Sequence, residues 1–563
     1  MDSDQLQIYI KSTVEGYADL VIKNARIVNV FTLELLTGDI AIKGGRILGI
    51  CGSYRGVHEI DAQGAYACPG FIDSHVHIES SMATPAGFAR TVLPHGTTAV
   101  IADPHEIANV AGIEGIAYML KQAEHIPLKI FIMLPSCVPC APFEHSGAVL
   151  ESKDLAAFLE HPNVLGLGEV MNYTAVLEGE PKILEKLRRF SSFSIDGHAP
   201  LLTGNKLNAY RLAGPSTDHE CSTYDEMLEK LRAGMHIQLR MGSAAHGIET
   251  ILRRIAYEEL PIDNISLCTD DKHLEDIRSS GHINYILKRA VAAGIGPLEA
   301  VRMATWNPAR HYKLRHFGAL APGYRADIVL LPELETFEPL NVIVGGKVYE
   351  DAPITVPSPP VSVLNSVHIK AITADSFKLK IQGKSPVIEL IPNQLITKLS
   401  MREVPKLDGL FQSGWGLCKL AVIERHHKTG HLGLGILSGL GLVGGAIAST
   451  VAHDSHNLIV AGDNDNDMLL AVNALELCGG GYVAVRNGEV RALLPLPIAG
   501  LMTDAPLDEI LSAQRKLFFE AKSLGILSEA DPFITLSFLA LPVIPEGRLT
   551  ERGVFQVFEQ RFV

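Results

Sequence analysis

The sequence predicts an α/β protein: a (β/α)₈ TIM-type barrel, a small β-sandwich domain formed by segments flanking the barrel, and a C-terminal α+β domain. Three observations support this fold class. Strand-like and helix-like runs alternate between residues 67 and 318, as in parallel βα units. Runs rich in Val and Ile flank that region on both sides. A proline-rich segment separates it from a further region of mixed character.

The flanking runs predict one small β domain that contains segments from before and after the barrel. Residues 19–50 hold short runs broken by Gly or Asn, which is typical of strands and turns. The same pattern returns at 326–331 and 341–350. We therefore assign residues 1–66 and 319–351 to this domain.

Eight strand candidates lie between the flanking runs, and amphipathic helical stretches separate many of them. Eight parallel strands with crossover helices close into a barrel. A doubly wound open sheet is the structural alternative, but eight units fit closure better. The candidates are residues 66–73, 96–103, 128–134, 163–169, 193–198, 215–219, 235–240 and 264–270.

The C-terminal part follows a segment with four prolines in eight positions, residues 353–360, which predicts a stiff linker. We place the linker at 352–364 and the α+β domain at 365–563. Residues 429–452 carry no Asp, Glu, Lys or Arg and are long enough to span a bilayer. Their seven glycines favour strands and turns over a membrane span.

The composition excludes some classes of protein. A formal net charge of -14 argues against a general nucleic-acid binder, which would need a basic face. The eight cysteines are scattered and do not resemble a disulfide framework. Cys137 and Cys140 form the only C-x-x-C, a weak signal for a zinc ribbon. The N-terminal segment lacks an apolar signal core, so we expect a cytoplasmic protein.

The predicted strand ends carry residues that bind metals. Barrel enzymes place catalytic groups at the C-terminal ends of their strands. The first strand runs into an H-x-H, whose two side chains point to the same side of an extended segment. Each such residue alone is more often a structural hydrogen-bonding group or a helix cap. Together, six at the ends of five strands favour a metal site: His75, His77, Glu169, His198, His219 and Asp270.

This ligand set exceeds what one catalytic ion with an open position needs, so we predict two divalent ions. Glu169 is the natural bridge between them. The two histidines of the first strand and Asp270 would hold one ion, and His198 and His219 the other. A water shared by both ions would be acidified and act as the nucleophile. Asp270 is then the catalytic residue that takes its proton and passes it on to the leaving group.

Longer motifs extend this pattern over essentially the whole chain. They include DPHEIANVAG at 103–112, GLGEVMNY at 166–173, CTDDKH at 268–273 and GAIASTVAHDSHN at 445–457. With these motifs the chain resembles the amidohydrolase superfamily and, more closely, the bacterial adenine deaminases. DPHEIANV and AHDSHN are far more specific than H-x-H, which the wider superfamily shares.

The resemblance implies hydrolytic deamination of free adenine to hypoxanthine and ammonia, a reaction of purine salvage. It also implies two divalent ions, most commonly manganese (Mn²⁺), with Fe²⁺ or Zn²⁺ as alternatives, and a homodimer. Many superfamily members bridge their ions with a carbamylated lysine. The fourth strand here offers Glu169 and no lysine, which is consistent with the adenine deaminase branch.

Four further side chains are candidates for contacts with the purine ring or for acid–base chemistry. Asp103, His105 and Glu106 follow the second strand, and Glu220 lies beside His219. Support of the metal ligands is the alternative role for all four.

The resemblance breaks after the seventh strand. The family usually shows Arg-Glu-Gly-Ser there, and this chain has Arg240-Met241-Gly242-Ser243, followed by a divergent segment at 244–249. Met can only fill apolar space, so we expect a working but slower enzyme that Met241→Glu would accelerate.

Two rival functions remain at this point. One is another amidohydrolase reaction, such as ring-opening of a cyclic amide or deamination of another purine. The other is a non-catalytic binding protein, but such relatives lose ligands and none is missing here. Two C-terminal histidine clusters allow a separate metal site, or are solvated, structural or dimer-contacting: His426, His427 and His431, and His453, Asp454 and His456.

Overall fold

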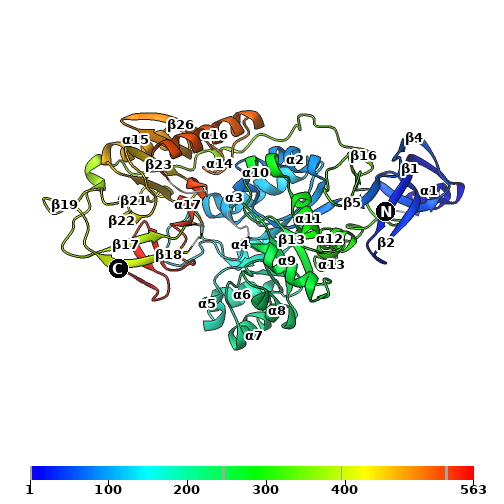
Figure 1. The fold of residues 1–563 in the computed structure, drawn as a ribbon, viewed down its shortest axis with the longest axis horizontal. Coiled ribbons are helices and arrows are strands. Elements are labelled where there is room, and N and C mark those ends of the chain that lie inside the picture. Colours follow the sequence, from blue (N-terminus) through cyan, green and yellow to red (C-terminus); the bar gives the residue numbers. More distant parts are fainter. Residues whose placement is uncertain (1–2, 244–246, 393, 395, 527–530) are drawn as a thin grey trace.

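The computed structural model describes residues 3–243, 247–392, 394, 396–526 and 531–563. Figure 1 shows three parts in a row: a β-rich part that contains the N-terminus, a central part of strands and helices, and a C-terminal part built on a second large sheet. Helix α1 (Ser3–Glu15) packs on the first strands of the β-rich part.

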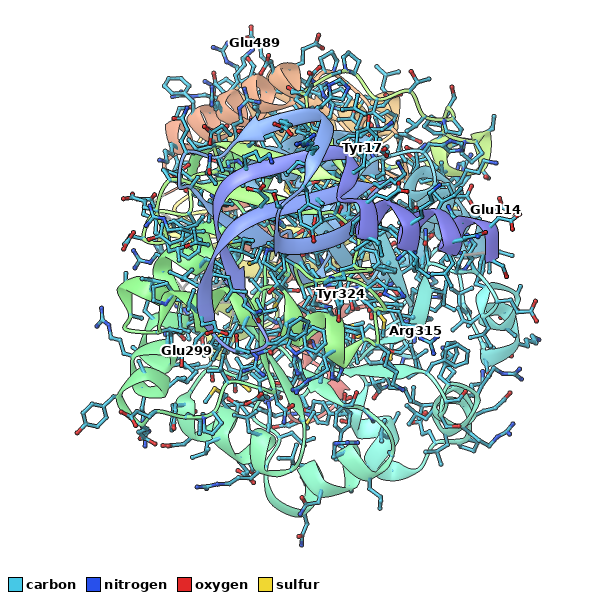
Figure 2. All side chains as sticks on the ribbon, turned by 90° about the vertical axis from the view of Figure 1, so that its right-hand side faces the viewer. Tyr17, Glu114, Glu299, Arg315, Tyr324 and Glu489 are labelled. Carbon is cyan, nitrogen blue, oxygen red and sulfur yellow. The ribbon has the colours of Figure 1, made fainter. Side chains whose placement is uncertain are left out.

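The β-rich part is an eight-stranded sheet in the order β16-β15-β14-β5-β1-β2-β3, with β4 paired to β1. Strand β14 pairs antiparallel with β5, so segments from both sides of the central part share this sheet. Figure 2 views it face-on, with Tyr17 and Tyr324 labelled. The strands are β1 (Tyr17–Asn29), β2 (Glu34–Lys43), β3 (Arg46–Gly52), β4 (Arg55–Asp61), β5 (Tyr66–Pro69), β14 (Ile328–Leu331), β15 (Asn341–Val344) and β16 (Lys347–Val348).

The eight strands belong to one hydrogen-bonded sheet, whereas the predicted β-sandwich would be two. The sheet surrounds a core of its own, which includes Ile22, Ile40 and Ile328. Alternating Val and Ile on these strands supply that core, since side chains of a strand point to opposite faces in turn.

The central part contains eight strands in two parallel sheets, ordered β10-β9-β8-β7-β6 and β11-β12-β13. Backbone hydrogen bonds join the two sheets: Ser216 N donates to Ile195 O, and Asp270 N donates to His75 O. The strands are β6 (Phe71–Val76), β7 (Thr97–Ala102), β8 (Lys129–Leu134), β9 (Val164–Val170), β10 (Ser194–Gly197), β11 (Thr217–Asp218), β12 (His236–Arg240) and β13 (Ile265–Cys268).

Each predicted strand overlaps an observed one, but the prediction of a single strand at 66–73 is wrong. The strand is interrupted at Gly70, whose N–H donates to Asp327 O. Residues before the break join the flanking sheet as β5, and residues after it form β6. A Cβ at position 70 would lie 2.1 Å from the Thr98 hydroxyl, so glycine permits this close crossing.

Helices follow most of the parallel strands and cover them. Helix α8, for example, is capped by Thr223, whose side chain accepts from Glu226 N, and it buries Tyr224 and Met227; this is a capped amphipathic helix. The helices are α2 (Pro85–Val92), α3 (His105–Ala123), α4 (Ser152–Leu155), α5 (Tyr173–Glu178), α6 (Pro181–Arg189), α7 (Gly204–Leu212), α8 (Tyr224–Arg232), α9 (Ile248–Tyr257), α10 (Leu274–Ser280), α11 (Ile283–Ala292), α12 (Pro297–Met303) and α13 (Trp306–His311). Short 3₁₀ turns are η1 (Ile78–Ser81), η2 (Leu93–His95), η3 (Ala156–Phe158) and η4 (Ala374–Phe377).

The C-terminal part is built on an eight-stranded sheet ordered β18-β17-β22-β21-β24-β23-β25-β26, with two small sheets, β19-β20 and β27-β28-β29. Its strands are β17 (Ser385–Leu390), β18 (Thr397–Arg402), β19 (Lys406–Leu407), β20 (Leu410–Phe411), β21 (Leu417–Ile423), β22 (Leu432–Ser438), β23 (Gly445–Ser449), β24 (Leu458–Gly462), β25 (Gly481–Arg486), β26 (Glu489–Pro495), β27 (Gly547–Thr550), β28 (Gly553–Gln556) and β29 (Arg561–Phe562). Its helices are α14 (Val361–Leu364), α15 (Asp465–Cys478), α16 (Leu507–Ser523) and α17 (Pro532–Phe538).

The uncharged run at 429–452 forms β22, β23 and the turns around them, as its glycines predict. No helix among the described residues is long and apolar enough to span a bilayer. The C-terminal sheet packs on the central part: Thr503 N donates to Met82 O, and one hydrophobic core includes both Met82 and Ile447. The C-terminal part therefore covers the ends of the parallel strands of the central part.

Candidate metal centre

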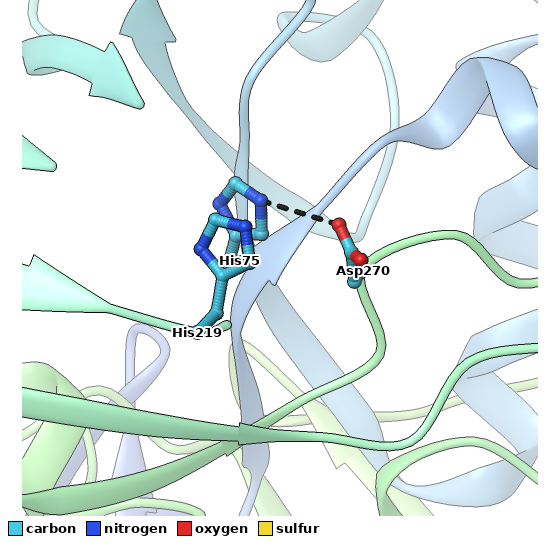
Figure 3. Close-up of side chains that lie close together, drawn as sticks. All are labelled: His75, His219 and Asp270. Carbon is cyan, nitrogen blue, oxygen red and sulfur yellow. Dashed lines mark ion pairs between the residues drawn. The ribbon is translucent and has the colours of Figure 1, made fainter. Parts of the chain in front are cut away.

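The structure brings the six predicted metal ligands together at the carboxyl ends of the parallel strands. His75 and Glu169 lie in β6 and β9, and the other four come within two residues of a strand end. Figure 3 shows His75 and His219 beside Asp270. The two imidazole rings stack with centroids 4.1 Å apart, and His75 Nε2 lies 3.4 Å from Asp270 Oδ1.

Glu169 lies between two groups of histidines. Its Oε1 is 3.2 Å from His77 Nε2 and 3.8 Å from His75 Nε2. Its Oε2 is 2.7 Å from His198 Nδ1 and 3.2 Å from His219 Nε2. Burial alone would raise the pKa of Glu169, but the surrounding imidazoles hold it well below its usual range. Each oxygen of this ionised carboxylate therefore contacts a different pair of histidines.

The nitrogens of this cluster fit a cation. Within the described part of the chain, both ring nitrogens of His75 and Nδ1 of His219 are buried without a hydrogen-bond partner. Leaving buried polar atoms unpaired costs about 1–3 kcal/mol each, and coordination through one nitrogen of His75 would remove part of that cost. His77 Nδ1 lies 2.9 Å from the Asp103 carbonyl oxygen, so Nδ1 carries the proton and Nε2 keeps its lone pair for a metal.

Arg240 holds Asp270 in its ionised form. It lies at the end of β12 and donates to Asp270 Oδ2 and, at 2.9 Å, to Glu220 Oε2. Burial alone would raise the pKa of Asp270, but Arg240 and the histidines lower it well below its usual range. Asp270 has φ of 60°, a left-handed conformation that Asp tolerates better than most residues. The sequence prediction missed Arg240, although its place at the end of the seventh strand was the available signal.

Asp103 and His105 contact Glu169, one of the predicted metal ligands. Asp103 Oδ2 accepts from Glu169 N at 2.9 Å, and Asp103 is absent from the cavity lining described below. His105 Nδ1 lies 3.5 Å from both Asp103 Oδ1 and Glu169 Oε1. This geometry favours the supporting role for Asp103, while His105 both supports the cluster and reaches the cavity.

Glu106, at the start of α3, contacts the C-terminal part. Its Oε1 lies 2.6 Å from His453 Nδ1, and its Oε2 contacts His456 Nε2. All three side chains are buried, so the interpretation of this C-terminal cluster as solvated is wrong. In the other cluster, His426 is buried against Ser455 O, whereas His431 is exposed.

A cavity of about 580 Å³ opens beside the cluster. Residues of the central and C-terminal parts both line it, and its apolar lining includes Met171, Ile248, Phe538 and Leu541. Its polar lining includes His77, Glu169, Glu220, Arg240, Asp270 and His453. An apolar wall opposite a few convergent polar groups is typical of a small-molecule site.

Met241 does not belong to the described cavity lining. Its side chain is 3% exposed and lies in the main hydrophobic core. Its chain neighbours Arg240 and Gly242 do line the cavity, so Met241 lies next to the site without being part of the described lining. Of the divergent segment after it, residues 244–246 lie outside the described residues.

Comparisons with known proteins agree with this site. The amidohydrolase family model matches residues 66–349, and the adenine deaminase C-terminal domain model matches residues 394–561. The chain is 43% identical to an adenine deaminase of Desulfitobacterium hafniense, over 100% of this chain and 99% of that protein. It is 46% identical to an adenine deaminase of Clostridium acetobutylicum, over 97% of each. The chain therefore belongs to the adenine deaminase family of the amidohydrolase superfamily.

Proposed function

We propose that the protein hydrolyses free adenine to hypoxanthine and ammonia. Beyond family membership, one observation carries this proposal: the two oxygens of Glu169 face two groups of histidines beside a partly apolar cavity. This arrangement suits a pair of divalent cations next to a small, flat substrate.

The donor set fits hard or borderline divalent cations, and we propose manganese, with iron and zinc as alternatives. Divalent cations in such a site acidify water, so that a nucleophile is available near neutral pH. We propose Glu169 as the ligand common to both cations, because its two oxygens point to different histidines. The residues proposed to hold the pair are His75, His77, Glu169, His198, His219 and Asp270.

Asp270 is our proposed acid–base residue. It accepts a proton from the attacking water and delivers a proton to the amino group on C6, which leaves as ammonia. Arg240 keeps Asp270 ionised before attack. Glu220 also contacts Arg240, with 2.6 Å between Glu220 Oε1 and Arg240 Nη1, and lines the cavity; we propose that it orients Arg240.

We further propose that the parallel strands form a closed (β/α)₈ barrel. The hydrogen bonds at both seams between the two parallel sheets support closure. The division into a flanking β domain, a barrel and a C-terminal domain at the boundaries given above is likewise our proposal, and the homodimer stays a prediction.

A substrate panel tests the function. Manganese-loaded protein is incubated with adenine, adenosine, other purines and cyclic amides; ammonia release is measured for the purines, and loss of substrate for the cyclic amides. We expect rapid release from adenine only. Turnover of another panel member without adenine would show that the metal centre serves a different amidohydrolase reaction.

A further inference from the structure

The Glu106–His453 pair joins the two parts of the molecule at the cavity. His453 lies in the connection between β23 and β24, and its Nδ1 is 2.6 Å from Glu106 Oε1 at the start of α3. Its ring stacks on Phe538, with centroids 4.6 Å apart and planes 24° from parallel. A carboxylate on one ring nitrogen and an aromatic face on the ring hold this imidazole in one orientation.

The other nitrogen of His453 is free to bind a ligand. Among the described residues, no hydrogen bond is formed by Nε2, and His453 lines the cavity. Burial alone would lower the pKa of His453, but Glu106 raises it to about 9. Near neutral pH the ring therefore carries a proton on each nitrogen, and Nε2 is a donor.

A cation bound by Glu106, His453 and His456 is the competing interpretation, because their ligand atoms lie close together. The backbone of Ala452 argues against it. Ala452 N donates to His456 Nδ1 at 3.1 Å, which requires the lone pair of Nδ1. The ring proton of a neutral His456 then sits on Nε2, which faces Glu106 and has no lone pair to offer a metal.

We propose that His453 is a substrate-binding residue supplied by the C-terminal part, whose Nε2–H donates to a purine ring nitrogen that is an acceptor in both adenine and hypoxanthine, that is, to a nitrogen other than N1. Glu106 is the positioning residue that orients it. The identity of the ligand rests on the proposed function, whereas the donor and its orientation rest on the contacts above. The C-terminal part then completes the pocket instead of only covering it.

Equilibrium dialysis with hypoxanthine tests the proposal without turnover. His453→Phe keeps the stacking on Phe538 and removes both nitrogens, while His453→Gln returns a donor of similar reach. A hydrogen bond from a charged donor is worth about 1.5–3 kcal/mol, so His453→Phe should weaken binding by about 10- to 150-fold. His453→Gln should recover part of that loss. The control is His427→Gln, because His427 Nε2 contacts Ser146 O outside the described cavity lining. This variant should bind hypoxanthine as tightly as the wild type.

Competition with three deaza-adenines, each lacking one ring nitrogen, identifies the acceptor. One analogue should bind the wild type more weakly than the other two, and His453→Phe should bind all three equally well. Unchanged hypoxanthine affinity in a folded His453→Phe overturns the proposal, as does the loss of one bound metal ion per chain, which would mark a cation site. If His453→Phe does not fold, His453→Gln is compared with His453→Asn, whose amide does not reach as far. Equal hypoxanthine affinity of these two variants then overturns the proposal. A wild type that binds no purine overturns the proposed function itself.

Discussion

Replacement of Asp270 by Asn tests the proposed proton transfer most directly. Asn has the same size but cannot accept the proton of the attacking water. Acid–base assistance contributes about 10²- to 10⁴-fold to a rate, which is about 3–5 kcal/mol of barrier. We therefore expect kcat to fall by that factor, measured as ammonia released from adenine.

The contacts of Asp270 add a second effect that must be separated from the first. Its Oδ2 accepts from Arg240 and its Oδ1 faces His75 and His77. The amide of Asn can present an oxygen to only one of these sides, so one charged contact is lost, at about 1.5–3 kcal/mol. Metal binding should weaken, and kcat must be expressed per metal-loaded chain.

Glu220→Gln is the matched control, because Glu220 also pairs with Arg240. Its contacts in the cluster are with His198 and His219, at 3.7 and 3.5 Å, whereas Asp270 contacts His75 and His77. Glu220→Gln should lose less than tenfold in kcat. If Asp270→Asn also loses less than tenfold at full metal occupancy, Asp270 is not the proton carrier. A large loss in Glu220→Gln alone would transfer that role to Glu220.

Four further predictions concern metal dependence, substrate choice, a buried ion pair and Met241. Removal of metal with a chelator should abolish ammonia release, and manganese should restore it; activity that survives complete removal would contradict a metal-dependent reaction. Free adenine should have a much higher kcat/KM than adenosine, as the family resemblance implies, and comparable values would refute this. Lys230→Ala breaks a buried pair with Asp218, at 2.9 Å, and should lower the unfolding free energy by about 3–5 kcal/mol; an unchanged denaturation midpoint would contradict it. Met241→Glu should release ammonia faster if the missing carboxylate slows this enzyme, and should melt earlier because the position is buried and a buried charge is costly.

Local sequence patterns predicted much of the central part of the molecule. Alternating strands and helices located the parallel strands along the chain, and residues at strand ends meet because parallel strands end on the same side. The interruption at Gly70 was missed because residues 66–73 are mostly apolar, although Pro69-Gly70 within them is a turn signal. The structure adds that glycine permits the close approach of the chain to Thr98 at this point.

The contribution of the C-terminal part could not be predicted in this way. Glu106 and His453 are 347 residues apart, and no periodicity or spacing relates residues at that separation. The motif AHDSHN marked the segment as unusual, but its partner became visible only with the packing of the C-terminal sheet on the central part. Arg240 was missed for a different reason: its place at the end of a strand is a weak signal by itself, and its contacts with Asp270 and Glu220 are what distinguish it.

The pair Glu169 and Glu106 provides a last prediction, because both are buried carboxylates surrounded by histidines. Glu169 touches both halves of the proposed metal centre, whereas the shortest contacts of Glu106 are with His453 and His456. Glu169→Ala should therefore lose bound metal, by elemental analysis after growth in manganese. Glu106→Ala should keep two ions per chain and instead bind hypoxanthine more weakly. Equal metal content in Glu169→Ala and wild type would refute the proposal that Glu169 binds both ions. Loss of metal from Glu106→Ala alone would instead place the metal centre nearer to the C-terminal histidines.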